Sequence, residues 1–90
     1  MFRIHVLISG EVQGVLFRKS TKEKAAQIGV MGWVKHFFSN AIEIKAEGSM
    51  EDLGKLLDWL SDGPEGAQID KVSVEWGPAK DQFQSFEISE

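Results

Sequence analysis

The chain has no cysteine and no long apolar run. Without cysteine it can form neither a disulfide nor a thiolate metal site. No apolar stretch approaches the roughly 20 residues that a membrane-spanning helix needs. The amino-terminal residues 1–6 alternate apolar and polar side chains, whereas a signal peptide carries a continuous apolar segment. We therefore expect a cytoplasmic protein without membrane contacts.

Positive charge is also scarce. Ten Lys and Arg stand against 14 Asp and Glu, which gives a net charge of −4. Nucleic-acid-binding domains usually carry a basic face, so no nucleic-acid partner is expected. An anionic ligand must be bound by a local feature, because the overall field does not favour it. With 42% hydrophobic residues and no low-complexity stretch, residues 1–90 are expected to fold as one domain and to be monomeric.

Hydrophobic periodicity in the first third of the chain predicts a strand followed by a helix. Residues 2–9 alternate apolar and polar side chains with the period of two that marks a half-buried strand. After residue 16, apolar or small residues recur at spacings of four, four and three, which is one face of a helix. Gly29 supplies the left-handed position that commonly ends a helix. The residues of this helical face are Phe17, Thr21, Ala25 and Ile28.

The middle of the chain predicts a hairpin and a second helix. Residues 32–38 and 41–46 are the two strands, with Ser39-Asn40 as the turn and Asn40 able to adopt positive φ. Ser49 is a helix N-cap, and Asp52 follows it at the capping-box position. An apolar stripe then continues to residue 60, and the Asp-Gly-Pro of residues 62–64 ends the helix.

Two further strands, at residues 72–76 and 86–88, complete the pattern. The order β-α-β-β-α-β with a short terminal strand predicts an α+β, ferredoxin-like sandwich. Its sheet should be mostly antiparallel, with both helices on one face. This fold hosts many unrelated activities, so function has to be argued from a site.

The segment that joins the first strand to the first helix suggests such a site. It reads Gly10-Glu11-Val12-Gln13-Gly14-Val15-Leu16-Phe17-Arg18. A short loop at a helix start directs unpaired backbone N–H groups toward one point, and glycines allow the tight bend. The guanidinium of Arg18 would add a charged fork that matches phosphate oxygens. No Lys followed by Ser or Thr comes after Gly14, which excludes a nucleotide P-loop. From the residues alone, the prediction is an oxyanion site.

The same segment resembles the first signature of the acylphosphatase family, G-x-V-Q-G-V-x-F-R, at every specified position. Residues 32–35, Gly-Trp-Val-Lys, with Ile42-Glu43 and Gly48, resemble the second signature. The resemblance extends over Trp59, residues 63–64 and residues 72–76. It implies an enzyme that hydrolyses the carboxyl–phosphate bond of small acyl phosphates, with no metal and no other cofactor.

The resemblance also implies roles for individual residues. Arg18 and the loop backbone would hold the phosphoryl group. A carboxylate with a pKa of about 4 leaves without a general acid, so positioning and charge stabilisation can suffice. The backbone groups concerned are those of Val12, Gln13, Gly14, Val15, Leu16 and Phe17.

His36 departs from the family pattern. The family has an asparagine directly after G-W-V-K, and this asparagine orients the attacking water; here the position is His36. Neutral histidine also offers one donor and one acceptor, but on opposite sides of a larger ring. His36 could orient the water, bind phosphate while hydrolysis stays slow, or be an exposed bystander. Asn40, at the turn, is expected to lie one hairpin end away from the loop and to be a poor substitute.

Two other functions remain open. One is a non-catalytic module that binds phosphate or carbamoyl phosphate, because similar domains occur within larger hydrogenase-maturation proteins. The other is RNA binding, since RNA-recognition modules share the β-α-β-β-α-β order. The strand at residues 41–46 carries no aromatic side chains and the net charge is negative, which argues against RNA.

Overall fold

The structure of the chain is a computed structural model, which describes residues 1–12, 15–38 and 40–89. The elements follow the predicted order, and the predicted helices and strands are all present. Their bounds are β1 (Phe2–Glu11), α1 (Val15–Ile28), β2 (Met31–Phe37), β3 (Ala41–Gly48), α2 (Met50–Asp62), β4 (Gln68–Pro78) and β5 (Phe86–Ile88).

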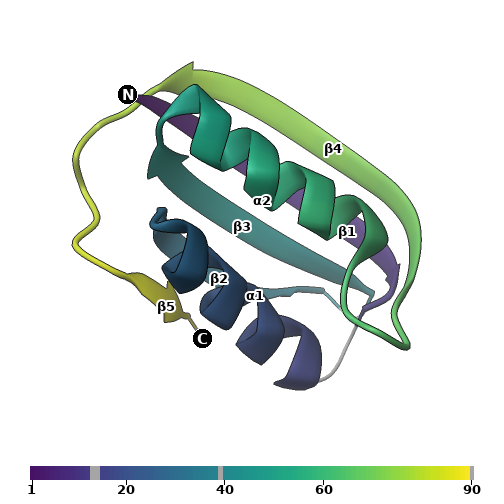
Figure 1. The fold of residues 1–90 in the computed structure, drawn as a ribbon. Helices are drawn as coiled ribbons and strands as arrows, with labels where there is room; N and C mark the ends of the chain where they lie inside the picture. Colours follow the sequence, from purple (N-terminus) through teal and green to yellow (C-terminus); the bar gives the residue numbers. More distant parts are fainter. Residues whose placement is uncertain (13–14, 39, 90) are drawn as a thin grey trace.

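The strands form one sheet in the order β4-β1-β3-β2-β5. All neighbouring pairs are antiparallel except β2 and β5, which run parallel. Figure 1 shows both helices on the same face of this sheet, with α2 above β3 and β1 and with α1 toward β2 and β5. The predicted ferredoxin-like α+β sandwich, with its mostly antiparallel sheet, is confirmed.

The core lies between the sheet and the two helices. On β1, Ile4, Val6 and Ile8 are fully buried, and on β3 they pair with Ala46, Ile44 and Ile42, which are fully buried too. Both helices contribute the residues that their spacing predicted. The buried members are Phe17, Thr21 and Ala25 of α1 and Leu53, Leu56 and Leu60 of α2. The alternation of β1 therefore determines which of its side chains face the helices, and the segment that follows β1 begins at the end of the sheet near Ile8 and Ile42.

A buried carboxylate ties the carboxyl-terminal segment to the sheet. Glu47, at the end of β3, is only 3% exposed. It accepts hydrogen bonds from Arg3 Nε at 3.0 Å and from the backbone N–H groups of Lys80 at 2.8 Å and Asp81 at 3.1 Å. These bonds hold the connection between β4 and β5 against β3, so that β5 can pair with β2.

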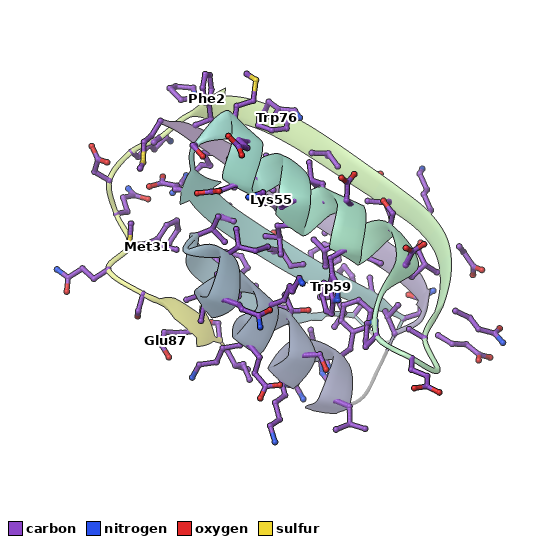
Figure 2. The ribbon with its side chains drawn as sticks, viewed as in Figure 1. Phe2, Met31, Lys55, Trp59, Trp76 and Glu87 are labelled. Carbon is purple, nitrogen blue, oxygen red and sulfur yellow. The ribbon has the colours of Figure 1, made fainter. Side chains whose placement is uncertain are left out.

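Strand β4 is longer than the sequence predicts. It extends from Gln68 to Pro78, well beyond the predicted residues 72–76, because it pairs with all of β1 across a β-bulge at Ser9 and Gly10. Trp76 of this strand is 47% exposed at the sheet edge, where its ring meets Phe2 edge-on (Figure 2). Among the described residues, no helix has the length and apolarity needed to cross a bilayer.

Candidate active site

Gly10 lies at the β-bulge of β1, where the register with β4 shifts and the pairing with β3 has ended. Its φ is 134°, a conformation that side-chain-bearing residues rarely adopt. A β-carbon at this position would lie 2.2 Å from the carbonyl oxygen of Gln68 and 2.8 Å from the backbone nitrogen of Asp70. The first glycine of the loop is therefore required by the close approach of β4 at the bulge.

Two buried apolar side chains fix the loop at its two ends. Val12 is 1% exposed and Phe17 is 4% exposed, so both belong to the core. Gln13 and Gly14 lie between them, outside the described residues. Helix α1 begins at Val15, which places the backbone of Val15, Leu16 and Phe17 in its first turn.

The first turn of α2 carries acidic residues, whereas the first turn of α1 carries none. In α2, Ser49 caps the helix by accepting a hydrogen bond from the Asp52 N–H at 3.1 Å, and Glu51 and Asp52 add negative charge. The first turn of α1 has no acidic residue. The N–H groups at a helix start have no intrahelical partner, and their dipoles favour an anion. The start of α1 thus leaves this favourable position free of the chain's own carboxylates.

Arg18 brings a guanidinium to the same turn. Its side chain is half-buried, and its Nε atom is buried without a hydrogen-bond partner. Within residues 1–12, 15–38 and 40–89, no acidic side chain forms an ion pair with it. A buried donor without a partner is uncommon and calls for an explanation, such as a ligand that accepts the bond. The guanidinium of Arg18 is thus not neutralised by a described acid.

His36 is placed at the same end of the sheet. It pairs with Ile42 of β3, which in turn pairs with Ile8 near the end of β1. Directly opposed residues of antiparallel strands share a face, and Ile8 and Ile42 are buried beneath the helices. His36 therefore lies on the helix-facing side of the sheet. Val34, two residues earlier on the same face, is buried, whereas His36 is exposed to solvent.

The β2–β3 hairpin lies closer to the loop than the sequence indicated. The carbonyl oxygen of Asn40 accepts a hydrogen bond from the N–H of Gly10 at 3.1 Å. The expectation that Asn40 lies a hairpin end away from the loop is wrong, because β1 pairs directly with β3 up to Ser9 and Ala41. Positive φ, predicted for Asn40, is found at Phe38, where φ is 59°.

Two exposed apolar side chains, Phe38 and Leu16, were not predicted from the sequence. Phe38 is 82% exposed and Leu16 is 70% exposed, although both are large and apolar. The signal for Phe38 was a second aromatic residue directly before the predicted turn. Among the described residues, no group of three or more His, Asp or Glu side chains is arranged to hold a metal ion.

Comparison with known proteins identifies the family. The family model described as acylphosphatase matches residues 4–88. A curated acylphosphatase from Marinobacter nauticus is 43% identical over 84 residues, which cover 93% of this chain and 91% of that protein. The chain belongs to the acylphosphatase family.

Solved acylphosphatase structures agree with this assignment. The crystal structure of acylphosphatase from Bacillus subtilis superposes with a TM-score of 0.94 at 27% identity, and each chain is covered completely. An acylphosphatase from Coxiella burnetii gives a TM-score of 0.90 at 36% identity, with 97% of this chain and 90% of that chain covered. The likeness therefore spans the whole sandwich of described strands and helices.

Proposed function

We propose that this chain is an acylphosphatase, which hydrolyses the carboxyl–phosphate bond of small acyl phosphates without a metal ion. The observation that carries the proposal is the buried Nε of Arg18, which has no hydrogen-bond partner and lies at a helix start without acidic residues. Family membership and relatives named acylphosphatase, about 40% identical over nearly the whole chain, support the same activity.

The reaction needs only one bond to form and one to break. The oxygen of a water molecule bonds to phosphorus, and the bond from phosphorus to the acyl oxygen breaks. Its electron pair leaves with the carboxylate, and the protons of the water pass to phosphate and solvent. Because the carboxylate is a weak base, its departure requires no general acid.

The residues of the loop and helix start act on the phosphoryl group. Arg18 and the backbone N–H groups of residues 12–17 hold its oxygens and stabilise the charge that spreads over them in the transition state. Arginine suits this role because its planar fork pairs with two oxygens at once. No step requires the protein to supply a nucleophile.

We assign to His36 the position that the family gives to its water-orienting asparagine. A neutral imidazole accepts a hydrogen bond from water at one nitrogen and donates one at the other. The exposure of His36 on the helix-facing side, at the end of the sheet where α1 begins, is compatible with a water between it and the phosphoryl group. The exchange of asparagine for histidine is expected to slow hydrolysis rather than abolish it.

The test is hydrolysis of benzoyl phosphate in the presence of a chelator. We expect turnover by the wild-type chain, and its loss in Arg18→Ala. Lys55→Ala is the matched control, because Lys55 is an exposed cation on α2 whose ion-pair partner among the described residues is Glu51, one helical turn away. Phosphate binding without turnover, at high enzyme concentration, would replace this proposal with that of a non-catalytic binding module.

The cellular setting belongs to the same proposal. We place the enzyme in the cytoplasm, because a chain without cysteine does not depend on an oxidising compartment. The site requires only one chain, since Arg18 and His36 of a single chain reach the same end of the sheet. We therefore propose a monomeric enzyme with a small-molecule substrate and no nucleic-acid partner.

A further inference from the structure

A small cavity lies on the face of the sheet that carries no helix, at the end where the β2–β3 hairpin turns. Figure 1 shows both helices on the other face. The cavity has a volume of about 210 Å³, below the roughly 300–1,000 Å³ of sites for drug-sized ligands, so its ligand must be small. The residues that line it on the helix-free face are Leu7, Phe37 and Ala41, which are apolar, and Ser9, Lys71 and Ser73, which are polar.

The register of the strands brings these residues together. Ile8 is buried beneath the helices, so the side chain of Ser9, its neighbour on β1, points to the helix-free face. Ser9 is paired with Lys71 on one side and with Ala41 on the other, and Ala41 is paired in turn with Phe37. Directly paired residues share a face of the sheet. The row therefore has a cation at one end, an aromatic ring at the other and small residues between them.

The apolar side chains of the cavity are only partly covered by the fold. Leu7 and Phe37 are both half-buried. The ring of Phe38 meets the ring of Phe37 edge-on, with 4.7 Å between the ring centroids and 74° between the planes. Phe38 has a left-handed φ of 59°, an outlier for a bulky residue, and such strain is concentrated at ligand-binding positions. Apolar surface at this corner of the sheet is thus accessible to a ligand.

Lys71 supplies the positive charge of the cavity. It is exposed, and none of the ion pairs in the described part of the chain includes it. The acidic residue of the adjacent row is Glu43, whose carboxylate lies 2.6 Å from His5 Nε2 and 3.7 Å from Lys35 Nζ. Glu43 is therefore engaged by its own neighbours. One ammonium group beside an apolar surface favours a ligand that has one negative charge and an apolar body.

We propose that this cavity binds a small aromatic monocarboxylate, with its ring on Leu7 and Phe37 and its carboxylate paired with Lys71. The two serine hydroxyls of the cavity can donate hydrogen bonds to the carboxylate oxygens. The site goes beyond the proposed function, because it lies on the face of the sheet opposite to α1, the helix that carries Arg18. Benzoate is the simplest ligand of this class.

The test is a titration with benzoate, followed through the backbone amide signals in nitrogen-15 NMR spectra. We expect shifts at Leu7, Ser9, Lys71 and Ser73, with a dissociation constant of about 1–10 mM for so small a ligand. Acetate lacks the ring and benzyl alcohol lacks the charge, so each should bind more weakly; equal affinity of either would overturn the proposal. The shifts should persist in Arg18→Met. Their loss in that variant would assign benzoate to the anion site at the start of α1 and would overturn the proposal too.

Three variants test the cavity itself. Lys71→Gln should weaken benzoate binding about two- to fivefold, because it removes one exposed ion pair, whereas Lys55→Gln on α2 should change nothing. Ser73→Phe adds a ring at an exposed strand position and should abolish the shifts by filling the cavity. Unchanged affinity in Lys71→Gln and Ser73→Phe would overturn the site.

A second copy of the chain is the other occupant that the measurements distinguish. If sedimentation equilibrium showed a dimer that Ser73→Phe abolishes, a second copy would cover the cavity and the proposal would be wrong. The titration requires no turnover. Failure of the proposed function and failure of this site are therefore separate results.

Discussion

Replacing Arg18 by methionine should abolish most of the catalytic activity without lowering the stability of the fold. Methionine keeps an unbranched apolar stem of similar length and removes the guanidinium. In the structure the Arg18 Nε is buried without a partner, and no described acidic side chain pairs with the guanidinium. Without a bound anion, the charge of Arg18 therefore adds little to the stability of the folded chain.

The expected change in stability follows from that unpaired atom. A buried donor without a hydrogen bond costs about 1–3 kcal/mol. Because methionine retains most of the packing of the stem, only the desolvation cost is removed. We expect the free energy of unfolding in urea to rise by about 1 kcal/mol, since part of the guanidinium remains solvated in the wild type.

Catalysis should respond in the opposite direction. Loss of a cation that stabilises transition-state charge in phosphoryl transfer lowers kcat by about a thousandfold or more. Inorganic phosphate at about one hundred times its dissociation constant should raise the wild-type free energy of unfolding by about 2.7 kcal/mol. The same phosphate concentration should leave Arg18→Met almost unchanged, because its anion site lacks the cation.

The assays are urea unfolding with and without phosphate, and benzoyl phosphate hydrolysis. If the substitution lowered the free energy of unfolding by about 2 kcal/mol or more, Arg18 would be a structural residue and the prediction would be wrong. If phosphate also stabilised the variant as much as the wild type, the reasoning from the unpaired Nε would be refuted.

Three other predictions test the surrounding structure. His36→Asn should raise the rate of benzoyl phosphate hydrolysis, because the amide carries its donor and its acceptor on one short group, whereas the imidazole carries them on opposite sides of a larger ring; an unchanged or lower rate would mean that histidine is adapted to this position. Glu47→Ala should lower the free energy of unfolding by about 3–5 kcal/mol, because it leaves the Nε of Arg3 and two backbone N–H groups without their acceptor, with Glu47→Gln less severe; equal losses would contradict the hydrogen-bond account. Ser49→Ala should cost about 1 kcal/mol of stability and leave kcat/KM unchanged, because it removes the cap of α2 alone.

The fold was predictable because its local patterns agree with its tertiary packing. The alternation in β1 and the spacing of the α1 face both point to the core that the structure contains. The interactions that escaped prediction all join distant parts of the chain. Burial of Glu47 depends on N–H groups 33 and 34 residues away, and the length of β4 depends on its pairing with β1. Neither the burial of Glu47 nor the length of β4 is indicated by the residues next to it in the sequence.

The candidate site was predictable to the extent that its motif is continuous. The segment from Gly10 to Arg18 could be interpreted residue by residue, and the structure shows a close approach of β4 that requires Gly10 and a buried Nε of Arg18 without a partner. The hairpin was harder to predict, since a turn with Asn40 suggests positive φ at that residue. Positive φ at Phe38 follows no residue preference, so it could not be predicted from the local sequence.

The hairpin offers one explanation for the ways in which this chain departs from its family. In our proposal, His36 takes the position of the water-orienting asparagine, at the end of β2 close to its turn. The Gly10–Asn40 hydrogen bond joins that turn to the segment between β1 and α1. A change in the hairpin can therefore alter the position of the water while Arg18 and the loop continue to hold phosphate. Exchanging residues 36–40 should then alter the rate of hydrolysis, while the affinity for inorganic phosphate stays constant. A large change in phosphate affinity would mean that the hairpin also shapes the anion site.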